Sequence, residues 1–171
     1  MKIEKTKKTK YPYKVTFNNG RASWVPSQHR FKTEYIRDHG CSLVAFYIAL
    51  RYLGKKKTMG TLLRYMRKHL DKYISAKLTI KGVSVGINKI MKEDCAVYYP
   101  KPDYKLILQC LKNDRLILLE TGNPIHTNVL IRGSGEKYYN ISDGRVTEID
   151  VGHIVSRATT SNVYRGCVIV R

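Results

Sequence analysis

Residues 38–54 read DHGCSLVAFYIALRYLG, and this stretch decides the fold. From Cys41 to Leu53 it is apolar nearly all round, which is typical of a helix that is buried on every side. Gly54 follows directly, and glycine is the preferred residue just beyond the end of a helix. The stretch therefore predicts a central buried helix that begins at Cys41, with the rest of the chain folded around it.

Helical periodicity predicts further helices after this centre. A second helix has Thr58 as its N-cap and an apolar face formed by residues 59, 62, 63, 66 and 70. A third, weaker helix follows Gly82, a fourth is capped by Asp103 and continues to Leu111, and a short one covers residues 151–157. The middle of the chain is therefore predicted to be mainly helical.

Strand patterns occur on both sides of the helical part. Asn18-Asn19-Gly20 is a turn signal between two short runs, 14–17 and 22–25. Later runs predict strands over 95–99, 116–119, 127–132, 137–141, 145–149 and 166–170, with Gly122-Asn123-Pro124 closing the second of them. Turn residues separate the middle runs, as in an antiparallel meander. Helices first and an antiparallel sheet last predict an α+β fold.

Composition limits the class of protein. The chain has 171 residues, with 32 Lys+Arg against 13 Asp+Glu and a formal net charge of +19. This length predicts a single domain over residues 11–171, preceded by a basic, disordered tail over residues 1–10. No apolar run is long enough to span a membrane, and the start lacks an apolar signal core, so we expect a cytoplasmic protein. The four cysteines form no CxxC pair, so neither a metal nor another cofactor is predicted.

The positive charge is informative about partners. One Lys cluster lies in residues 1–10, and a second Lys/Arg cluster over residues 51–72 lies largely on the polar side of a predicted helix. Such charge attracts polyanions in general. The chain has no zinc-finger spacing, RNA-recognition aromatic motif or GXXG loop, so nucleic acid is the less favoured partner. We expect a neutral or acidic peptide as the substrate, with an anionic polymer as a further possible partner.

Cys41 is the candidate nucleophile. Its place at the start of the buried helix puts the sulfur beside unpaired backbone N–H groups and the positive end of the helix dipole, which favours the thiolate. The other cysteines, Cys95, Cys110 and Cys167, lie within apolar or strand patterns, where packing in the core is the usual role. Cys41 is therefore the cysteine expected to react.

His126 is the candidate base. It begins a predicted strand, and a two-residue turn at Ser134-Gly135 would place Asp143 directly across from it, at roughly 4.5–5.5 Å between Cβ atoms. A carboxylate there would hold the imidazole in one tautomer, as in a catalytic triad. Asp143-Gly144 is equally a type I′ turn signal, in which Asp143 serves only the backbone. The reserve candidates are His153 for the base and Asn140 for the orienting group; His39 is too close to Cys41 in sequence.

The residues assembled so far resemble a known family. Residues 38–54 are similar to the catalytic-cysteine helix of the bacteriocin-processing peptidases, papain-like cysteine peptidases that remove double-glycine leaders, and of their free-standing relatives. Residues 126–143 resemble the His strand of that family and the next strand, which ends in Asp. The likeness covers about residues 34–150 and implies a papain-like fold. It also implies that Cys41 is the nucleophile, His126 the base and Asp143 the orienting group.

The chain departs from the family pattern at the oxyanion hole. The family has a Gln about six residues before the cysteine, where this chain has Glu34 and Tyr35. Tyr35 could donate through its hydroxyl, or Gln28 could reach the site from further upstream, so these two residues are the oxyanion-hole candidates. Ser42 replaces the Gly that commonly follows the cysteine.

The sequence therefore predicts a thiol hydrolase, a cysteine peptidase that cleaves a peptide or amide bond through Cys41, His126 and Asp143. A thiol acyltransferase would use the same residues, with an amine in place of water. Two other classes of function stay open. One is a catalytically silent papain-like binding module, which the missing Gln favours; the other is a basic nucleic-acid-binding protein.

Overall fold

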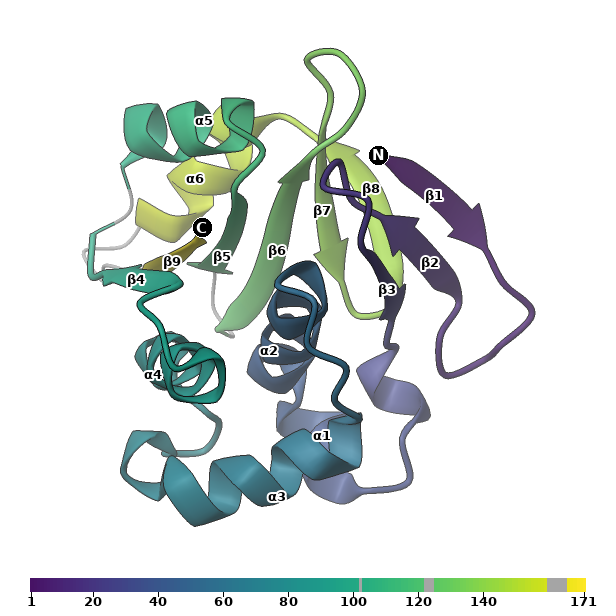
Figure 1. Cartoon of the computed structure of the whole chain (residues 1–171), viewed down its shortest axis with the longest axis vertical. Helices are drawn as coiled ribbons and strands as arrows, with labels where there is room; N and C mark the ends of the chain where they lie inside the picture. Colours follow the sequence, from purple (N-terminus) through teal and green to yellow (C-terminus); the bar gives the residue numbers. More distant parts are fainter. Residues whose placement is uncertain (102, 122–124, 160–165) are drawn as a thin grey trace.

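The chain folds as an α+β protein in a computed structural model that describes residues 1–101, 103–121, 125–159 and 166–171 (Figure 1). Helices occupy the middle of the sequence, a six-stranded antiparallel sheet comes from the C-terminal half, and a small three-stranded sheet comes from the N-terminus. The predicted α+β class and the C-terminal antiparallel sheet are confirmed, although a small sheet precedes the helices. The predicted turn residues Gly122-Asn123-Pro124 lie outside the described part of the chain.

The small sheet corrects the prediction for the N-terminus. It has the order β1-β2-β3, with β1 at Lys2–Lys5, β2 at Tyr13–Thr16 and β3 at Ala22–Val25. The hairpin between β2 and β3 is confirmed, and Gly20 has the positive φ of 78° that its turn requires. Residues 1–10 are not a disordered tail, because Ile3 pairs with Val15 and packs against the core.

The large sheet has the order β4-β9-β5-β6-β7-β8, and each neighbouring pair is antiparallel. Its strands are β4 at Ala96–Tyr99, β5 at Leu116–Thr121, β6 at His126–Arg132, β7 at Tyr138–Ser142, β8 at Arg145–Ile149 and β9 at Cys167–Val170. The meander β6-β7-β8 agrees with the prediction. The last strand, β9, lies between β4 and β5, so the end of the chain joins two strands from its middle.

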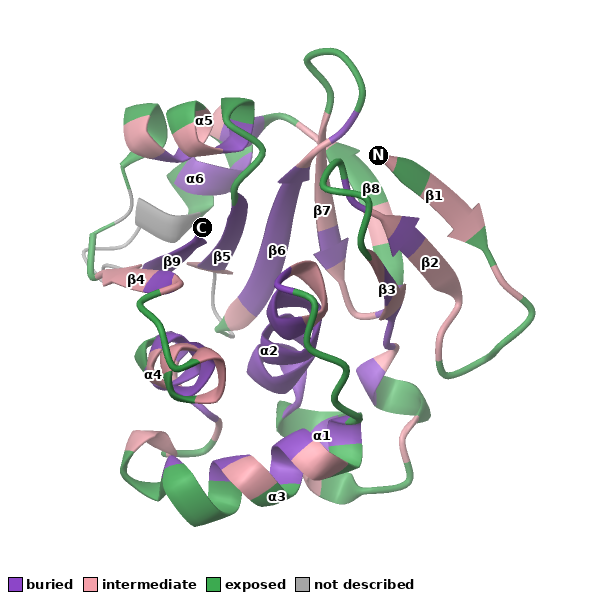
Figure 2. Ribbon diagram, viewed as in Figure 1, coloured by how far each residue is buried: buried purple, intermediate pink, exposed green. Residues whose placement is uncertain are grey.

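Both faces of the large sheet are covered by helices. Along β5, Leu116 and Leu118 belong to the core that contains helix α2 (Cys41–Tyr52), whereas Ile117 and Leu119 belong to the core beneath the two helices of the opposite face. This alternation follows from the two-residue period of a strand. Helix α5 is Tyr104–Lys112 and α6 is Val151–Thr159. The sheet is therefore a middle layer, and purple buried residues run along β5, β6 and α2 in Figure 2.

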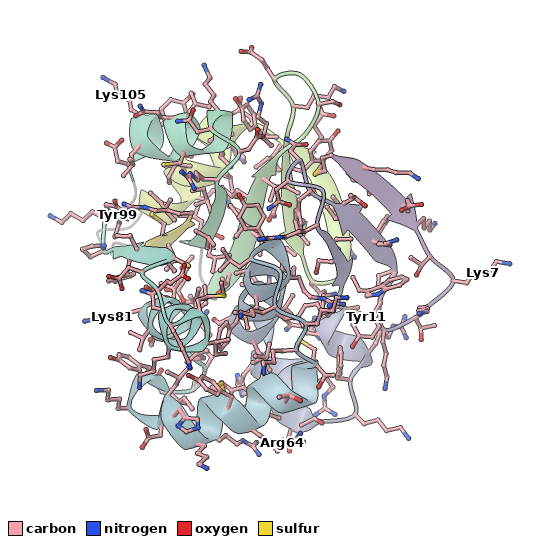
Figure 3. All side chains as sticks on the ribbon, viewed as in Figure 1. Lys7, Tyr11, Arg64, Lys81, Tyr99 and Lys105 are labelled. Carbon is pink, nitrogen blue, oxygen red and sulfur yellow. The ribbon has the colours of Figure 1, made fainter. Side chains whose placement is uncertain are left out.

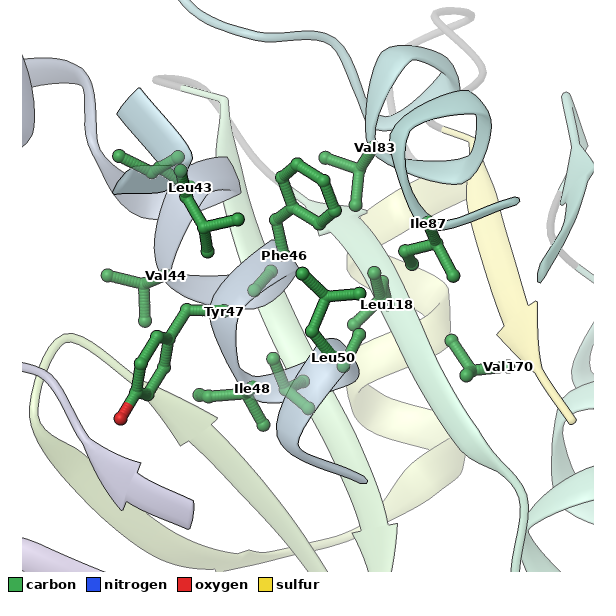
Figure 4. Close-up of a cluster of buried hydrophobic side chains, with 14 of the residues drawn as sticks. Leu43, Val44, Phe46, Tyr47, Ile48, Leu50, Val83, Ile87, Leu118 and Val170 are labelled. Atoms are coloured by element: carbon green, nitrogen blue, oxygen red, sulfur yellow. The ribbon is translucent and has the colours of Figure 1, made fainter. Parts of the chain in front are cut away.

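Helix α2, at Cys41–Tyr52, is the centre of the larger core, as predicted. All residues from Cys41 to Leu50 are buried. Figure 4 shows Phe46 and Leu50 beside Val83 and Ile87 of the neighbouring helix α4 (Ile80–Met91), with Leu118 of the sheet behind them. Only Arg51 and Tyr52, at the C-terminal end of the helix, are partly exposed.

The capping predictions for the next helices are confirmed. In α3, Met59–His69, Thr58 Oγ1 accepts a hydrogen bond from the Thr61 N–H at 3.1 Å. In α5, Asp103 Oδ1 accepts from the Leu106 N–H at 2.7 Å. The short helix η2 at Asp71–Tyr73 precedes α4, which covers Ile80–Met91 and begins two residues before Gly82.

Besides η2, two helical elements were not predicted. The short helix η1 at Gln28–Arg30 and helix α1 at Glu34–His39 fill the stretch that the sequence indicates only as turn-rich. Helix α1 passes into α2 through Gly40 alone. A Cβ at Gly40 would lie 2.1 Å from the Ile36 carbonyl oxygen, so glycine is required at this junction. The junction fixes where Cys41 lies.

No helix among the described residues is both long enough and apolar enough to cross a membrane.

Candidate active site

Cys41 is the first residue of α2 and is 7% exposed. The Val44 N–H bonds to the Gly40 carbonyl at 2.8 Å, so the helical hydrogen bonding begins directly before the cysteine. The Ser42 hydroxyl lies 2.9 Å from the hydroxyl of Thr127, which ties the start of α2 to the start of β6. This contact brings Cys41 to His126, the first residue of β6.

Lys77 is the cation next to the thiol. Its Nζ lies 3.6 Å from Cys41 Sγ, 3.2 Å from the Ile125 carbonyl oxygen and 3.4 Å from a carboxylate oxygen of Glu120. The side chains of Lys77 and Glu120 are only 15% and 13% exposed, so water screens the charges weakly. Lys77 was not predicted as a site residue, because it lies in the loop before α4 and no motif or spacing marks it among the many lysines.

The environment of Cys41 favours the thiolate. Burial is the largest influence and raises the pKa, but hydrogen bonding to His126, the charge of Lys77 and hydrogen bonding to Thr127 lower it, so that the pKa falls from 9.0 to about 6. At Cys167 the net shift has the opposite direction, because burial raises the pKa to about 12. Burial also raises the pKa of Cys95 and of Cys110. Cys41 is thus distinct among the cysteines, and the groups that lower its pKa are His126, Lys77 and Thr127 rather than the helix start on which the prediction relied.

The other side of the His126 ring contacts Ser142, whose Oγ is hydrogen-bonded to His126 Nε2. Because this contact uses Nε2, Nδ1 is the ring nitrogen that can interact with the Cys41 thiol. Ser142 is the last residue of β7, one position before Asp143, the predicted orienting residue. Ser142 was not among the predicted site residues.

The predicted register that placed Asp143 across from His126 is wrong by one residue. Leu130 pairs with Asn140, where a two-residue turn would have given Tyr139. The turn is longer because Gly133 closes it with Lys137 through an N–H···O bond of 2.7 Å, and Gly135 takes the positive φ of 67°. Three-residue hairpin loops use a glycine in this left-handed position.

Asp143 lies in the next turn. Its φ is 45° and that of Gly144 is 72°, as a type I′ turn requires, so the backbone role considered from the sequence is present. One oxygen, Oδ2, lies 3.2 Å from His29 Nε2, and the other, Oδ1, is buried without a hydrogen-bond partner. Asp143 and His126 line the same open pocket of about 390 Å³, so the carboxylate remains beside the imidazole without bonding to it.

The two oxyanion-hole candidates differ. Gln28 is buried in η1, and its Nε2 donates to the Arg37 carbonyl of α1 at 3.3 Å. The Tyr35 hydroxyl accepts from the Leu78 N–H at 2.9 Å and still has its own proton to donate. The pKa of Tyr35 is raised chiefly by burial, with the charge on Cys41 as a further cause, so Tyr35 lies within the field of the thiolate. Tyr35 is the better placed of the two.

The reserve candidates lie elsewhere. His153 is on α6, across the sheet from α2, and its N–H donates at 2.7 Å to Asp150 Oδ1, which caps that helix. His39 ends α1, where its ring centroid is 5.9 Å from that of Tyr35. Asn140 lines the pocket with His126, but its Nδ2 donates to Asn128 Oδ1 at 2.9 Å.

Within the described part of the chain, no three His, Cys, Asp or Glu side chains gather where they could hold a metal ion. The arrangement instead joins an acidified thiol, an imidazole and an ammonium at one end of α2.

Comparison of the chain with protein-family models, curated proteins and solved structures finds no match.

Proposed function

We propose that the chain is a thiol hydrolase that cleaves a peptide or amide bond, with Cys41 as the nucleophile and His126 as the acid and base. The observation that carries the proposal is the approach of two groups, His126 and the Lys77 ammonium, to a cysteine at the start of a buried helix. A thiolate held in this way is the reactive form of the residue. The resemblance to the papain-like bacteriocin-processing peptidases supports the same assignment of Cys41 and His126.

In the proposed reaction, the Cys41 thiolate attacks the carbonyl carbon of the scissile bond, and the carbonyl oxygen becomes an oxyanion. The His126 imidazolium then gives its proton to the departing amine as the C–N bond breaks and a thioester remains. Water, deprotonated by His126, attacks the thioester, and the acid product leaves with Cys41 restored. An amine in place of water would make the enzyme an acyltransferase.

Lys77 and Tyr35 supply the stabilisation that the family obtains from a Gln. In the proposal, the Lys77 ammonium holds the thiolate in the resting state and the oxyanion after attack, with the Cys41 N–H as a second donor. The Tyr35 hydroxyl is a third donor. Removal of one oxyanion donor typically slows turnover by about 10²–10³-fold, so the replacement must be effective for an active enzyme.

Ser142 is proposed as the group that orients His126, and Asp143 as a charge in the same pocket. A hydroxyl fixes a tautomer but stabilises an imidazolium less than a carboxylate does, because it carries no charge. The Lys77 ammonium offsets part of this weakness by stabilising the thiolate directly. A neutral or acidic peptide is the substrate that this positive environment favours.

The test is cleavage of a complex peptide mixture, with new termini read by mass spectrometry. We expect the wild-type chain to produce new termini that Cys41→Ala and His126→Ala abolish, while Lys68→Gln on the exposed side of α3 cleaves normally. A new terminus carrying an added amine would assign acyl transfer. Equal products from wild type and Cys41→Ala would disprove the proposal.

A catalytically silent binding module is the second candidate. It is favoured by Gln28, whose amide bonds to the backbone of α1, and by the low exposure of Cys41. For this candidate the peptide mixture stays intact, and the wild-type chain and Cys41→Ala retain the same peptides on a column.

A further inference from the structure

A second site lies away from Cys41, at the C-terminal part of α2. It is an open pocket of about 360 Å³, within the usual size range of small-molecule sites. Arg51 of α2 contributes to it, ten residues after Cys41, which places the two about 15 Å apart along the helix. We call it the Arg51 pocket. The proposed hydrolase does not use it, so the inference below goes beyond that function.

Cations from three segments line the Arg51 pocket: Lys8 from the β1–β2 loop, Arg51 from α2, and Lys56 and Lys57 from the α2–α3 loop. No Asp or Glu is among its described lining residues. Like charges repel one another when they converge without a counterion. This lining therefore indicates an anionic ligand.

Arg51 provides a second, independent observation. Its Nε is buried and has no hydrogen-bond partner. Buried donors in proteins are nearly always paired. The guanidinium carbon lies 5.6 Å from the centre of the Tyr47 ring, so the side chain is held in place. The buried Nε is out of reach of a ligand, but Arg51 also lines the pocket, so its positive charge is available to an anion there.

The walls of the pocket are aromatic: Tyr11, Trp24 and Tyr47. Figure 4 shows the Tyr47 ring on the side of α2 away from Phe46, with its hydroxyl pointing outward. Lys8 Nζ lies 4.2 Å from the centre of the Trp24 ring, so this ring face already attracts a cation at the pocket edge. Figure 3 shows Tyr11 on the small-sheet side of the molecule. Aromatic rings offer stacking surfaces to a planar ligand.

We propose that the Arg51 pocket binds a nucleotide, a planar base joined to a phosphate. The phosphate bonds to Arg51 and to Lys56 and Lys57, and the base lies against Trp24 and Tyr11. The N-terminus of α3 at Thr58 adds its positive dipole end to the phosphate side. The same chemistry is presented by a free mononucleotide and by the 5′-phosphate end of a nucleic-acid strand.

Trp24 is the single tryptophan of the chain, so its fluorescence reports directly on the pocket. We expect a nucleoside 5′-monophosphate, titrated into the full chain at low salt, to change this fluorescence with saturation. The matching nucleoside and inorganic phosphate should each bind at least 10-fold more weakly, because each lacks one half of the recognised group. A 5′-phosphorylated oligonucleotide that binds more tightly than its unphosphorylated form and the mononucleotide assigns a strand end as the source. If the phosphorylated oligonucleotide binds no more tightly than the mononucleotide, the free nucleotide is assigned as the ligand.

Matched variants separate the pocket from general charge. Lys56→Gln/Lys57→Gln should weaken mononucleotide binding at least 10-fold, whereas Lys55→Gln/Lys68→Gln, with the same loss of charge on exposed residues outside the pocket, should leave it within about 2-fold. Arg51→Gln should weaken binding at least as much as the pocket pair, and thermal melts confirm that each variant is folded.

Three results would overturn the proposal. The first is the absence of a saturable change up to about 10 mM mononucleotide, the affinity of a very weak ligand. The second is equal weakening by the two double variants, which would mean non-specific attraction. The third is inorganic phosphate binding as tightly as the nucleotide, because the aromatic walls would then contribute nothing.

Discussion

At the scale of single residues, Cys41 shows how neighbours reverse the effect of burial. Cys41 and Cys167 are both buried, yet the pKa of Cys41 falls to about 6 and that of Cys167 rises to about 12. The difference comes from His126, Lys77 and Thr127, which stabilise the thiolate, whereas Cys167 lies among apolar groups. Reactivity at this site therefore depends on the neighbours of Cys41 and can be tested one neighbour at a time.

The first prediction concerns the alkylation of Cys41 by iodoacetamide across pH. Since the thiolate is the form that reacts, the rate should be half-maximal near pH 6 and should fall about tenfold for each pH unit below it. Peptide mapping by mass spectrometry separates Cys41 from Cys95, whose pKa burial raises. A midpoint for Cys41 between pH 8 and 9, where ordinary thiols titrate, would contradict the assignment.

The second prediction concerns Lys77→Met. Loss of the ammonium 3.6 Å from the sulfur should raise the pKa of Cys41 and slow its alkylation at pH 6 by about tenfold or more. Lys81→Met removes the same charge from an exposed position in the first turn of α4 and should leave the profile unchanged. Identical profiles for the two variants would show that Lys77 does not act on the thiolate.

The third prediction distinguishes Ser142 from Asp143 as the partner of His126. Because Ser142 Oγ bonds to His126 Nε2, Ser142→Ala should loosen the imidazole and shift the alkylation midpoint of Cys41 to higher pH. Ser142→Thr keeps a hydroxyl and should restore the midpoint. Asp143→Asn should not raise it, since the Asp143 carboxylate is paired with His29. A shift with Asp143→Asn alone would return the orienting role to Asp143.

The residues that could be predicted from the sequence were those marked by an element boundary. Cys41 begins a helix and His126 begins a strand, and both boundaries are visible as changes of pattern. The contact of Ser142 with His126 could not be predicted, because it depends on the length of the hairpin loop between β6 and β7. A loop longer by one residue changes which residue lies beside His126. The approach of Lys77 to Cys41 depends on the path of a loop in which the sequence shows no recognisable pattern.

At the scale of elements, the junction between α1 and α2 positions the thiol. The two helices meet at Gly40, which packs against the Ile36 carbonyl too closely for a side chain. Helix α1 was not predicted because its six residues carry only one buried side chain, Ile36, and so show no helical stripe. Strand β1 was missed for a similar reason, since only Ile3 interrupts its charged residues.

The fourth prediction compares two glycines in helical surroundings. Gly40→Ala should destabilise the protein by about 1–3 kcal/mol, the usual cost of overpacking, and should slow Cys41 alkylation because the start of α2 must move. Gly60→Ala, in the first turn of α3, meets no atom within 4 Å and should stabilise by about 0.4–1 kcal/mol. Denaturant unfolding measures both. Equal stability of the two variants would show that the junction tolerates a side chain.

At the scale of the whole molecule, a sheet covered on both faces coexists with a large positive charge. Alternating residues of β5 and β9 supply one core on each face, so the central sheet does not depend on charge for its stability. The net charge of +19 lies on a surface where ion pairs such as Lys137–Glu148 are exposed and contribute little. Figure 3 shows Lys7, Arg64, Lys81 and Lys105 projecting from different sides of the molecule. The charge therefore acts mainly as repulsion spread over the surface.

The fifth prediction follows from this repulsion. Raising NaCl from about 10 mM to about 200 mM shortens the Debye length from about 30 Å to below 10 Å, so repulsion between distant lysines is screened and Tm should rise by several degrees. Replacing the exposed Lys7, Lys55 and Lys68 with Gln lowers the net charge from +19 to +16 and should raise Tm at low salt while reducing its salt dependence. Chloride serves for this measurement, because phosphate would also report on the Arg51 pocket. A Tm that falls with salt would mean that attractive pairs outweigh the repulsion, and the positive surface would then be part of what holds the fold together.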